Sequence, residues 1–136
     1  MKFDDYIGIP FVDNGNTRKG CDCWRLVVMV YQDHLNIDLP DFDGLCIDRT
    51  GATALLSSLR RIRAKICEYK EKWKRVENPQ PYDVIILRNS DDLYHCGIAI
   101  NRREMLHTME GIDSAIEDFT GLYWKDRIEG ISRYTG

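Results

Sequence analysis

The stretch Gly20-Cys21-Asp22-Cys23-Trp24-Arg25-Leu26-Val27 lies where a loop passes into a helix. Glycine, proline and an Asp-Asn-Gly-Asn run punctuate residues 6–20, which predicts a loop there. From Cys23 to about His34, apolar residues recur on one face at helical spacing: Leu26, Val27, Val30 and Tyr31. Asp22 is the predicted N-cap, because its carboxylate can accept a first-turn N–H. Cys23 is therefore expected to open the helix.

The position of Cys23 suits a nucleophile. A thiol attacks a carbonyl as the thiolate, and the positive end of the helix dipole stabilises that charge. Unpaired N–H groups of the first turn can also hold the oxyanion that forms after attack. Cys21 lies two residues earlier, in the loop, and lacks both advantages. Cys23 is the predicted nucleophile, and the charge of Asp22 is assigned to capping the helix.

The cysteine and histidine content narrows the search for a catalytic partner. The five cysteines are an odd number, which disfavours a framework of disulfides: Cys21, Cys23, Cys46, Cys67 and Cys96. A nucleophilic cysteine needs a base, and the chain has three histidines. His34 lies near the far end of the helix that Cys23 opens, roughly 16 Å away at 1.5 Å per residue, and cannot reach the thiol. His95 and His107 remain.

The remaining pattern predicts one α+β domain over residues 1–136. After the first helix, a long amphipathic helix is expected at about residues 52–76, ending before Asn78-Pro79. The second half predicts strands, with a short helix near Phe119–Trp124; the strands are expected at residues 83–88, 95–100, 104–108, 111–116 and 128–134. Helices first and an antiparallel sheet second indicate the α+β class.

The hairpin between the second and third of these strands brings the two histidines together. If Asn101-Arg102-Arg103 forms a three-residue loop, Gly97 lies opposite His107. His95 and His107 are then diagonal neighbours on one face, within reach of each other, and Gly97 leaves room between them. His95 is the predicted base and His107 the residue that orients it, as in a catalytic triad.

Charge and hydropathy exclude some classes of protein. The net charge is −3, which does not favour a nucleic-acid partner, although residues 60–75 carry eight Lys/Arg and two Asp/Glu. That segment is interpreted as a solvated helix face. No apolar run is long enough to cross a membrane, and residues 1–5 lack the apolar core of a secretory signal. Synthesis in the cytoplasm is expected.

Several blocks resemble the NlpC-type cell-wall cysteine peptidases of the papain-like superfamily, in the same order along nearly the whole chain. The Asp22-Cys23 pair matches the nucleophile motif, and Trp24 is frequent in the phage-encoded branch. The other matching blocks are Leu39-Pro40-Asp41-Phe42, Pro81-Tyr82-Asp83-Val84-Ile85-Ile86, His95-Cys96-Gly97-Ile98-Ala99-Ile100, Met105-Leu106-His107 and Trp124…Arg127…Arg133-Tyr134.

The resemblance implies a compact papain-like fold, with N-terminal helices packed on the C-terminal sheet, and hydrolysis of amide bonds in peptidoglycan stem peptides. It implies no cofactor and no metal. The phage branch implies a role in the virion tail, alongside other tail proteins, with action at the host cell wall.

Some residues depart from the family pattern beside the nucleophile. Arg25 replaces the usual glycine two residues after the cysteine, where its charge opposes the helix dipole and is expected to crowd the cleft. Phe11 stands where a tyrosine is frequent, and Tyr82 replaces a glycine before Asp83. Four residues are predicted to contact substrate: Phe11, Asp22, Trp24 and Arg25.

Three other interpretations stay open on the sequence alone. Cys21, Cys23, His95 and His107 resemble a zinc-binding set, although Cys-x-Cys is tighter than the usual spacing. The basic segment and Arg25 are also compatible with a weakly active or inactive tail-assembly protein that keeps the fold. A thiol amidase or acyltransferase acting on another substrate is the third, because one fold hosts several chemistries.

Overall fold

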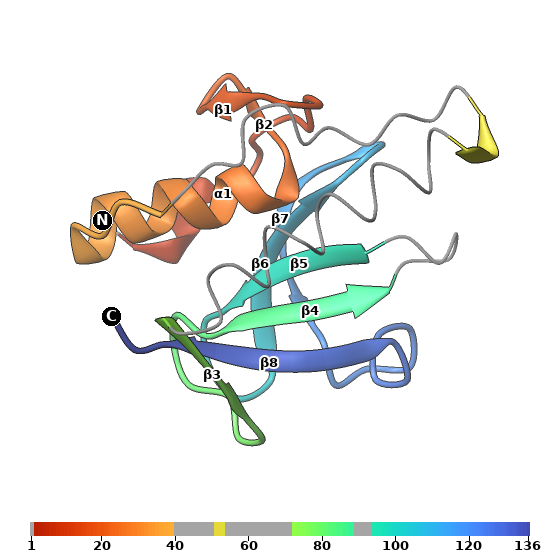
Figure 1. Cartoon of the computed structure of the whole chain (residues 1–136). Coiled ribbons are helices and arrows are strands. Elements are labelled where there is room, and N and C mark those ends of the chain that lie inside the picture. Colours follow the sequence, from red (N-terminus) through yellow and green to blue (C-terminus); the bar gives the residue numbers. More distant parts are fainter. Residues whose placement is uncertain (1, 40–50, 54–71, 89–93) are drawn as a thin grey trace.

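A six-stranded antiparallel sheet forms the body of the computed structural model, which describes residues 2–39, 51–53, 72–88 and 94–136 (Figure 1). Across the sheet the strands follow the order β3-β8-β4-β5-β6-β7. Their bounds are β3 (Trp73–Val76), β4 (Val84–Arg88), β5 (Tyr94–Ala99), β6 (Glu104–Met109), β7 (Ile112–Asp118) and β8 (Ile128–Tyr134). With the helix that precedes them, they confirm the predicted α+β class.

The N-terminal elements carry the predicted nucleophile helix. They are a 3₁₀ turn η1 (Phe3–Tyr6), a two-stranded ribbon of β1 (Asn16–Thr17) and β2 (Gly20–Cys21), the helix α1 (Cys23–Val30) and a π-helical end η2 (Tyr31–Leu35). Asp22 caps α1, since its side chain accepts the N–H of Arg25 at 2.9 Å. Asn36 ends the helical run in the left-handed conformation. The predicted cap and helix are confirmed.

Helix α1 packs on one face of the sheet, against β5 and β6 (Figure 1). Its predicted apolar face is buried, and it meets Ile98 and Leu106 in one core cluster. Each large apolar side chain buried in this way contributes roughly 1.5–3 kcal/mol. No helix in the described ranges is long and apolar enough to span a membrane.

A second core cluster is formed by the strand residues that alternate with those of the first cluster. Ala99 and Met105 pack there with Phe119 and Trp124 from the segment after β7. That segment forms turns, so the short helix predicted near Phe119–Trp124 is wrong. Burial of the two aromatic rings under the sheet, and the N–H of Thr120 bonded to Asp118, hold the chain in a non-helical path.

The long helix predicted at residues 52–76 is wrong at its C-terminal end. Residues 54–71 lie outside the described residues, but Trp73–Val76 is strand β3 and pairs with β8 in antiparallel register. Trp73 packs on the ring of Tyr134 at 5.1 Å between centroids. Two apolar residues three apart fit a helix stripe as well as a strand end, and pairing with β8 decides the structure.

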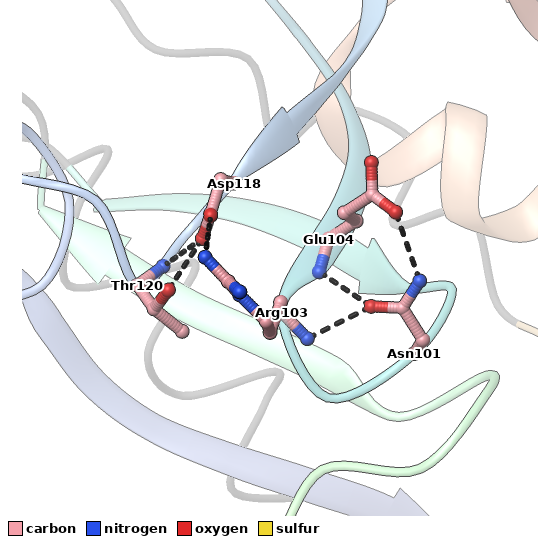
Figure 2. A network of polar contacts seen from close by, with 5 residues as sticks. All are labelled: Asn101, Arg103, Glu104, Asp118 and Thr120. Atoms are coloured by element: carbon pink, nitrogen blue, oxygen red, sulfur yellow. Dashed lines mark hydrogen bonds and ion pairs between the residues drawn. The ribbon is translucent and has the colours of Figure 1, made fainter.

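The β5–β6 hairpin has the predicted register. Ile98 lies opposite Leu106, and the Ile100 N–H donates to the Glu104 carbonyl at 2.9 Å. Figure 2 shows how side chains brace the turn: Asn101 Oδ1 accepts the N–H groups of Arg103 and Glu104, each at 2.8 Å. Arg103 pairs with Asp118 at the end of β7 at 3.0 Å. The turn thus ties β5, β6 and β7 into one fixed alignment.

Candidate active site

Cys23, half-buried at the first position of α1, contacts two consecutive residues of β5. Hydrogen bonds from the Cys96 thiol and from the His95 imidazole lower the pKa of Cys23 well below its ordinary value. The positive charge on His95 and the Cys96 backbone N–H act in the same direction, whereas burial opposes them. The site therefore favours a Cys23 thiolate, as the helix start alone predicted.

Cys96 takes the opposite protonation state. Its hydrogen bond to Cys23 and its burial raise the pKa of the Cys96 thiol well above its ordinary value. Cys96 therefore stays protonated, and its thiol donates a hydrogen bond to the Cys23 sulfur. In the sequence, Cys96 stands out only as part of a strand block; in the structure, the alternation of side chains along β5 places it on the α1 face.

Cys21 and Cys23 differ in their chemical surroundings, as the sequence predicted. It is fully buried in the core beneath α1. Burial, together with the neighbouring Asp22 and Cys23, raises the pKa of Cys21 to about 12. Cys21 is thus a protonated, inaccessible thiol at neutral pH.

The predicted contact between the two histidines is confirmed. His95 Nε2 lies 2.8 Å from His107 Nδ1, and both rings are buried. A Cβ added at Gly97 would lie 2.8 Å from the Met105 sulfur and 3.3 Å from His107 Cβ. Gly97 is therefore required for β6 to approach this closely.

A carboxylate that the sequence analysis missed completes the line. His107 Nε2 lies 2.5 Å from Glu117 Oε2 on β7, and the indole N–H of Trp124 donates to the same oxygen at 3.0 Å. Burial and the charge on His95 lower the pKa of His107, while Glu117 opposes that shift. The strand predicted at residues 111–116 stopped one residue before Glu117, so its face was never assigned.

Trp124 covers both imidazoles. Its ring stacks on that of His95 with centroids 5.6 Å apart at 23°, and meets His107 edge-on at 5.7 Å. Such ring contacts add about 0.5–1.5 kcal/mol beyond area burial. Cys23, His95, His107 and Glu117 therefore form a continuous line of contacts, with Trp124 packed against its middle.

Comparison with known proteins identifies the chain. The family model described as the NlpC/P60 family matches residues 8–133. The chain belongs to the NlpC/P60 family. No match is found among curated proteins.

Solved structures share the NlpC/P60 fold with this chain at low identity. A Staphylococcus aureus Mu50 protein, described as similar to lipoprotein and of the NLP/P60 family, has 20% identity and a TM-score of 0.62 over 98% of this chain. The NlpC/P60 domain of the peptidoglycan hydrolase SagA has 16% identity and a TM-score of 0.59, covering 96% of this chain and 92% of that one. An NlpC/P60 family protein from Bacillus cereus ATCC 10987 has 18% identity and a TM-score of 0.65 over 98% of this chain. The chain spans only 39% and 38% of the Staphylococcus and Bacillus proteins.

Two of the predicted substrate contacts in this NlpC/P60 domain are bonded to each other. Arg25 Nη1 lies 2.7 Å from Asp22 Oδ2 and 3.0 Å from Asn14 Oδ1, and only 6% of the Arg25 side chain is exposed. Burial and the charge on Cys23 raise the pKa of Asp22, and Arg25 opposes that rise. The charge of Arg25 thus turns back onto the helix cap. The substrate roles of Asp22 and Arg25, and crowding of the cleft by Arg25, stay predictions.

The other two predicted substrate contacts lie in different surroundings. Phe11 is half-buried, and its backbone pairs with that of Cys21 in a single parallel β-bridge. Trp24 packs near Trp73 of β3, with ring centroids 6.5 Å apart. A role for Phe11 and Trp24 in binding substrate stays a prediction.

The zinc interpretation does not fit the contacts of His107 in this NlpC/P60 domain. One of its ring nitrogens bonds His95 and the other bonds Glu117, so neither is left to ligate a metal. Within residues 2–39, 51–53, 72–88 and 94–136, no group of three or more His, Cys, Asp and Glu side chains is arranged to hold a metal ion.

Proposed function

We propose that this chain is a cysteine peptidase that hydrolyses amide bonds of peptidoglycan stem peptides. Membership of the NlpC/P60 family supports the proposal, as does the likeness to the domain of SagA, a protein named as a peptidoglycan hydrolase. The observation that carries it is the contact line from Cys23 through His95 to His107, in which the thiol is biased toward its anion.

In the first half of the reaction, the Cys23 thiolate attacks the carbonyl carbon of the scissile amide. The backbone N–H groups of the first turn of α1, beginning with that of Cys23, are the donors proposed to hold the oxyanion. His95, protonated by the thiol, then gives that proton to the leaving amine as the C–N bond breaks. A thioester between Cys23 and the acyl part of the substrate remains.

In the second half, His95 takes a proton from a water molecule that attacks the thioester carbonyl. The C–S bond breaks, the carboxylic acid product leaves and gives its proton to solvent, and the Cys23 thiolate is again paired with a protonated His95. His107 holds the ring of His95 in place through both steps, since their bond leaves the other nitrogen of His95 for the thiol.

The test is incubation of the purified protein with muropeptides, followed by mass analysis of the products. The wild type is expected to cleave a stem-peptide bond, and Cys23→Ala is expected to abolish cleavage while the thermal melt stays cooperative. Cys21→Ala is the matched control, because that thiol is buried and protonated, and should retain most activity. Unchanged cleavage by Cys23→Ala contradicts the proposal.

The finer proposal is that the protein acts from a phage or prophage tail. It rests on the sequence blocks around Trp24 and Leu39-Pro40-Asp41-Phe42, which resemble the tail-associated branch. Mass spectrometry of purified virions is the test. Tail proteins are then the expected partners, and absence of the chain from the particles contradicts this placement.

A further inference from the structure

The second ring nitrogen of His107 lies against Glu117. His107 Nε2 and Glu117 Oε2 are 2.5 Å apart, and the His107 side chain is fully buried whereas 44% of the Glu117 side chain is exposed. A carboxylate accepts hydrogen bonds and donates none, so this contact requires the proton on His107 Nε2.

Strand register explains why the three side chains meet. His107 lies opposite Ala115 on β7, and Glu117 lies opposite Met105 on β6. Glu117 on β7 is therefore a diagonal neighbour of His107 on the same face of the sheet. His95 on β5, the strand that flanks β6 opposite β7, is its other diagonal neighbour on that face. The line of side chains crosses three adjacent strands, and the braced turn of Figure 2 fixes their alignment.

Trp124 holds the carboxylate in place from a second direction. Its indole N–H donates to Glu117 Oε2 at 3.0 Å, the oxygen that also faces His107. The Trp124 ring is 3% exposed and stacked on His95, so the donor itself has little freedom to move. Glu117 is thus a fixed acceptor, although its side chain is partly exposed.

The protons of the two imidazoles follow from this acceptor. With a proton on Nε2, a neutral His107 has a lone pair on Nδ1, which then accepts the N–H of His95 Nε2 at 2.8 Å. His95 Nδ1 is then the nitrogen that exchanges a proton with Cys23. We propose that Glu117 is a positioning residue that fixes the tautomer of His107, and through it makes Nδ1 of His95 the base. This inference rests on the proposed function.

Two substitutions of similar size separate this role from packing. Glu117→Leu removes the acceptor, and kcat is expected to fall about 10- to 100-fold with little change in KM, the loss found when the partner that orients a metal-bound histidine is removed. Glu117→Gln keeps an amide oxygen that can accept from both His107 and Trp124, and should restore much of kcat. Glu129→Gln, on β8, is the control for removing a carboxylate and should leave kcat unchanged.

The second readout is independent of turnover. In protein labelled with ¹⁵N-histidine, long-range ¹H–¹⁵N spectra report which nitrogen of His107 carries the proton. The wild type should show a protonated Nε2 and an unprotonated Nδ1, and Glu117→Leu should show a mixture. A wild-type His107 protonated on Nδ1, or equal kcat for the Leu and Gln variants, overturns the inference. Because the spectra need no substrate, they decide it even if no wall peptide is cleaved.

Discussion

The Cys96 thiol on β5 donates a hydrogen bond to the sulfur of Cys23 at the first position of α1. Since that bond is the largest influence that lowers the Cys23 pKa, Cys96→Val should raise the pKa toward its ordinary value. Once that pKa lies above the ambient pH, each further unit of rise lowers the thiolate fraction about tenfold. The rate of iodoacetamide alkylation of Cys23 against pH measures the shift.

Cys21→Ala is the control for the alkylation experiment. Cys21 is also buried near Cys23, but it makes no hydrogen bond that lowers the pKa of Cys23. Its alkylation profile should match that of the wild type. Identical inflections for Cys96→Val and the wild type are the outcome that contradicts a donor role for Cys96.

His107 should make the fold less stable in acid. Burial and the charge on His95 lower its pKa in the folded state, below the value of about 6.5 of an unfolded chain. The unfolded state then binds more protons, so stability is fully present above the unfolded value and falls as pH decreases toward the folded one. His107→Gln should flatten this slope by up to about 1.4 kcal/mol per pH unit, measured by urea unfolding from pH 7.5 to 5. Parallel slopes for the two proteins rule this out.

Tyr82 occupies a backbone conformation that favours glycine. Its φ is 75°, where an L side chain costs roughly 1–2 kcal/mol, and its carbonyl accepts the hydroxyl of Tyr31. Tyr82→Gly and Tyr82→Ala both lose the ring and its bond to His34, but only Ala keeps the strain. The Gly variant should be about 1 kcal/mol more stable than the Ala variant in denaturant titrations. The usual order, with Ala more stable, is the contrary result.

Asp83 is a buried carboxylate held by Arg133 of β8. Two hydrogen bonds of 2.9 and 2.8 Å join them, and Asp83 also accepts the backbone N–H of Gln80 at 2.8 Å. Asp83→Asn weakens bonds made to a charged group and should lower the free energy of unfolding by about 2 kcal/mol. Asp118→Asn, at the exposed pair with Arg103, is the comparison and should cost less. Equal losses at the two sites contradict the burial argument.

The sequence was sufficient to predict those elements whose local signals agree with the fold. Helix α1, its cap at Asp22 and the β5–β6 register follow from periodicity and turn chemistry, and the small number of histidines then pairs His95 with His107. Those predictions depend on contacts within about a dozen residues, or on a hairpin whose loop length sets the register.

The remaining features depend on contacts between distant segments. Strand β3 exists because residues 73–76 pair with β8, nearly sixty residues later, and no local pattern signals that pairing. Glu117 joins the site because β7 continues to Asp118, two residues beyond the strand expected at residues 111–116. Cys96 becomes a donor because of where the start of α1 meets β5. Packing of α1 on the sheet, rather than propensity, decides that contact.

The hairpin turn that Asn101 and Arg103 brace limits where the chain can accept insertions and deletions. His95, His107 and Glu117 share one face, and neighbouring residues of a strand alternate between faces. A single codon inserted into β6 before His107 would turn its imidazole to the other face of the sheet and break its bonds to His95 and Glu117. An insertion within residues 101–103 would change the loop length that sets the register and would displace the bonds of Asn101 and Arg103. Descendants of this sequence that keep the contacts among His95, His107 and Glu117 are therefore expected to keep a constant length from β5 to β7.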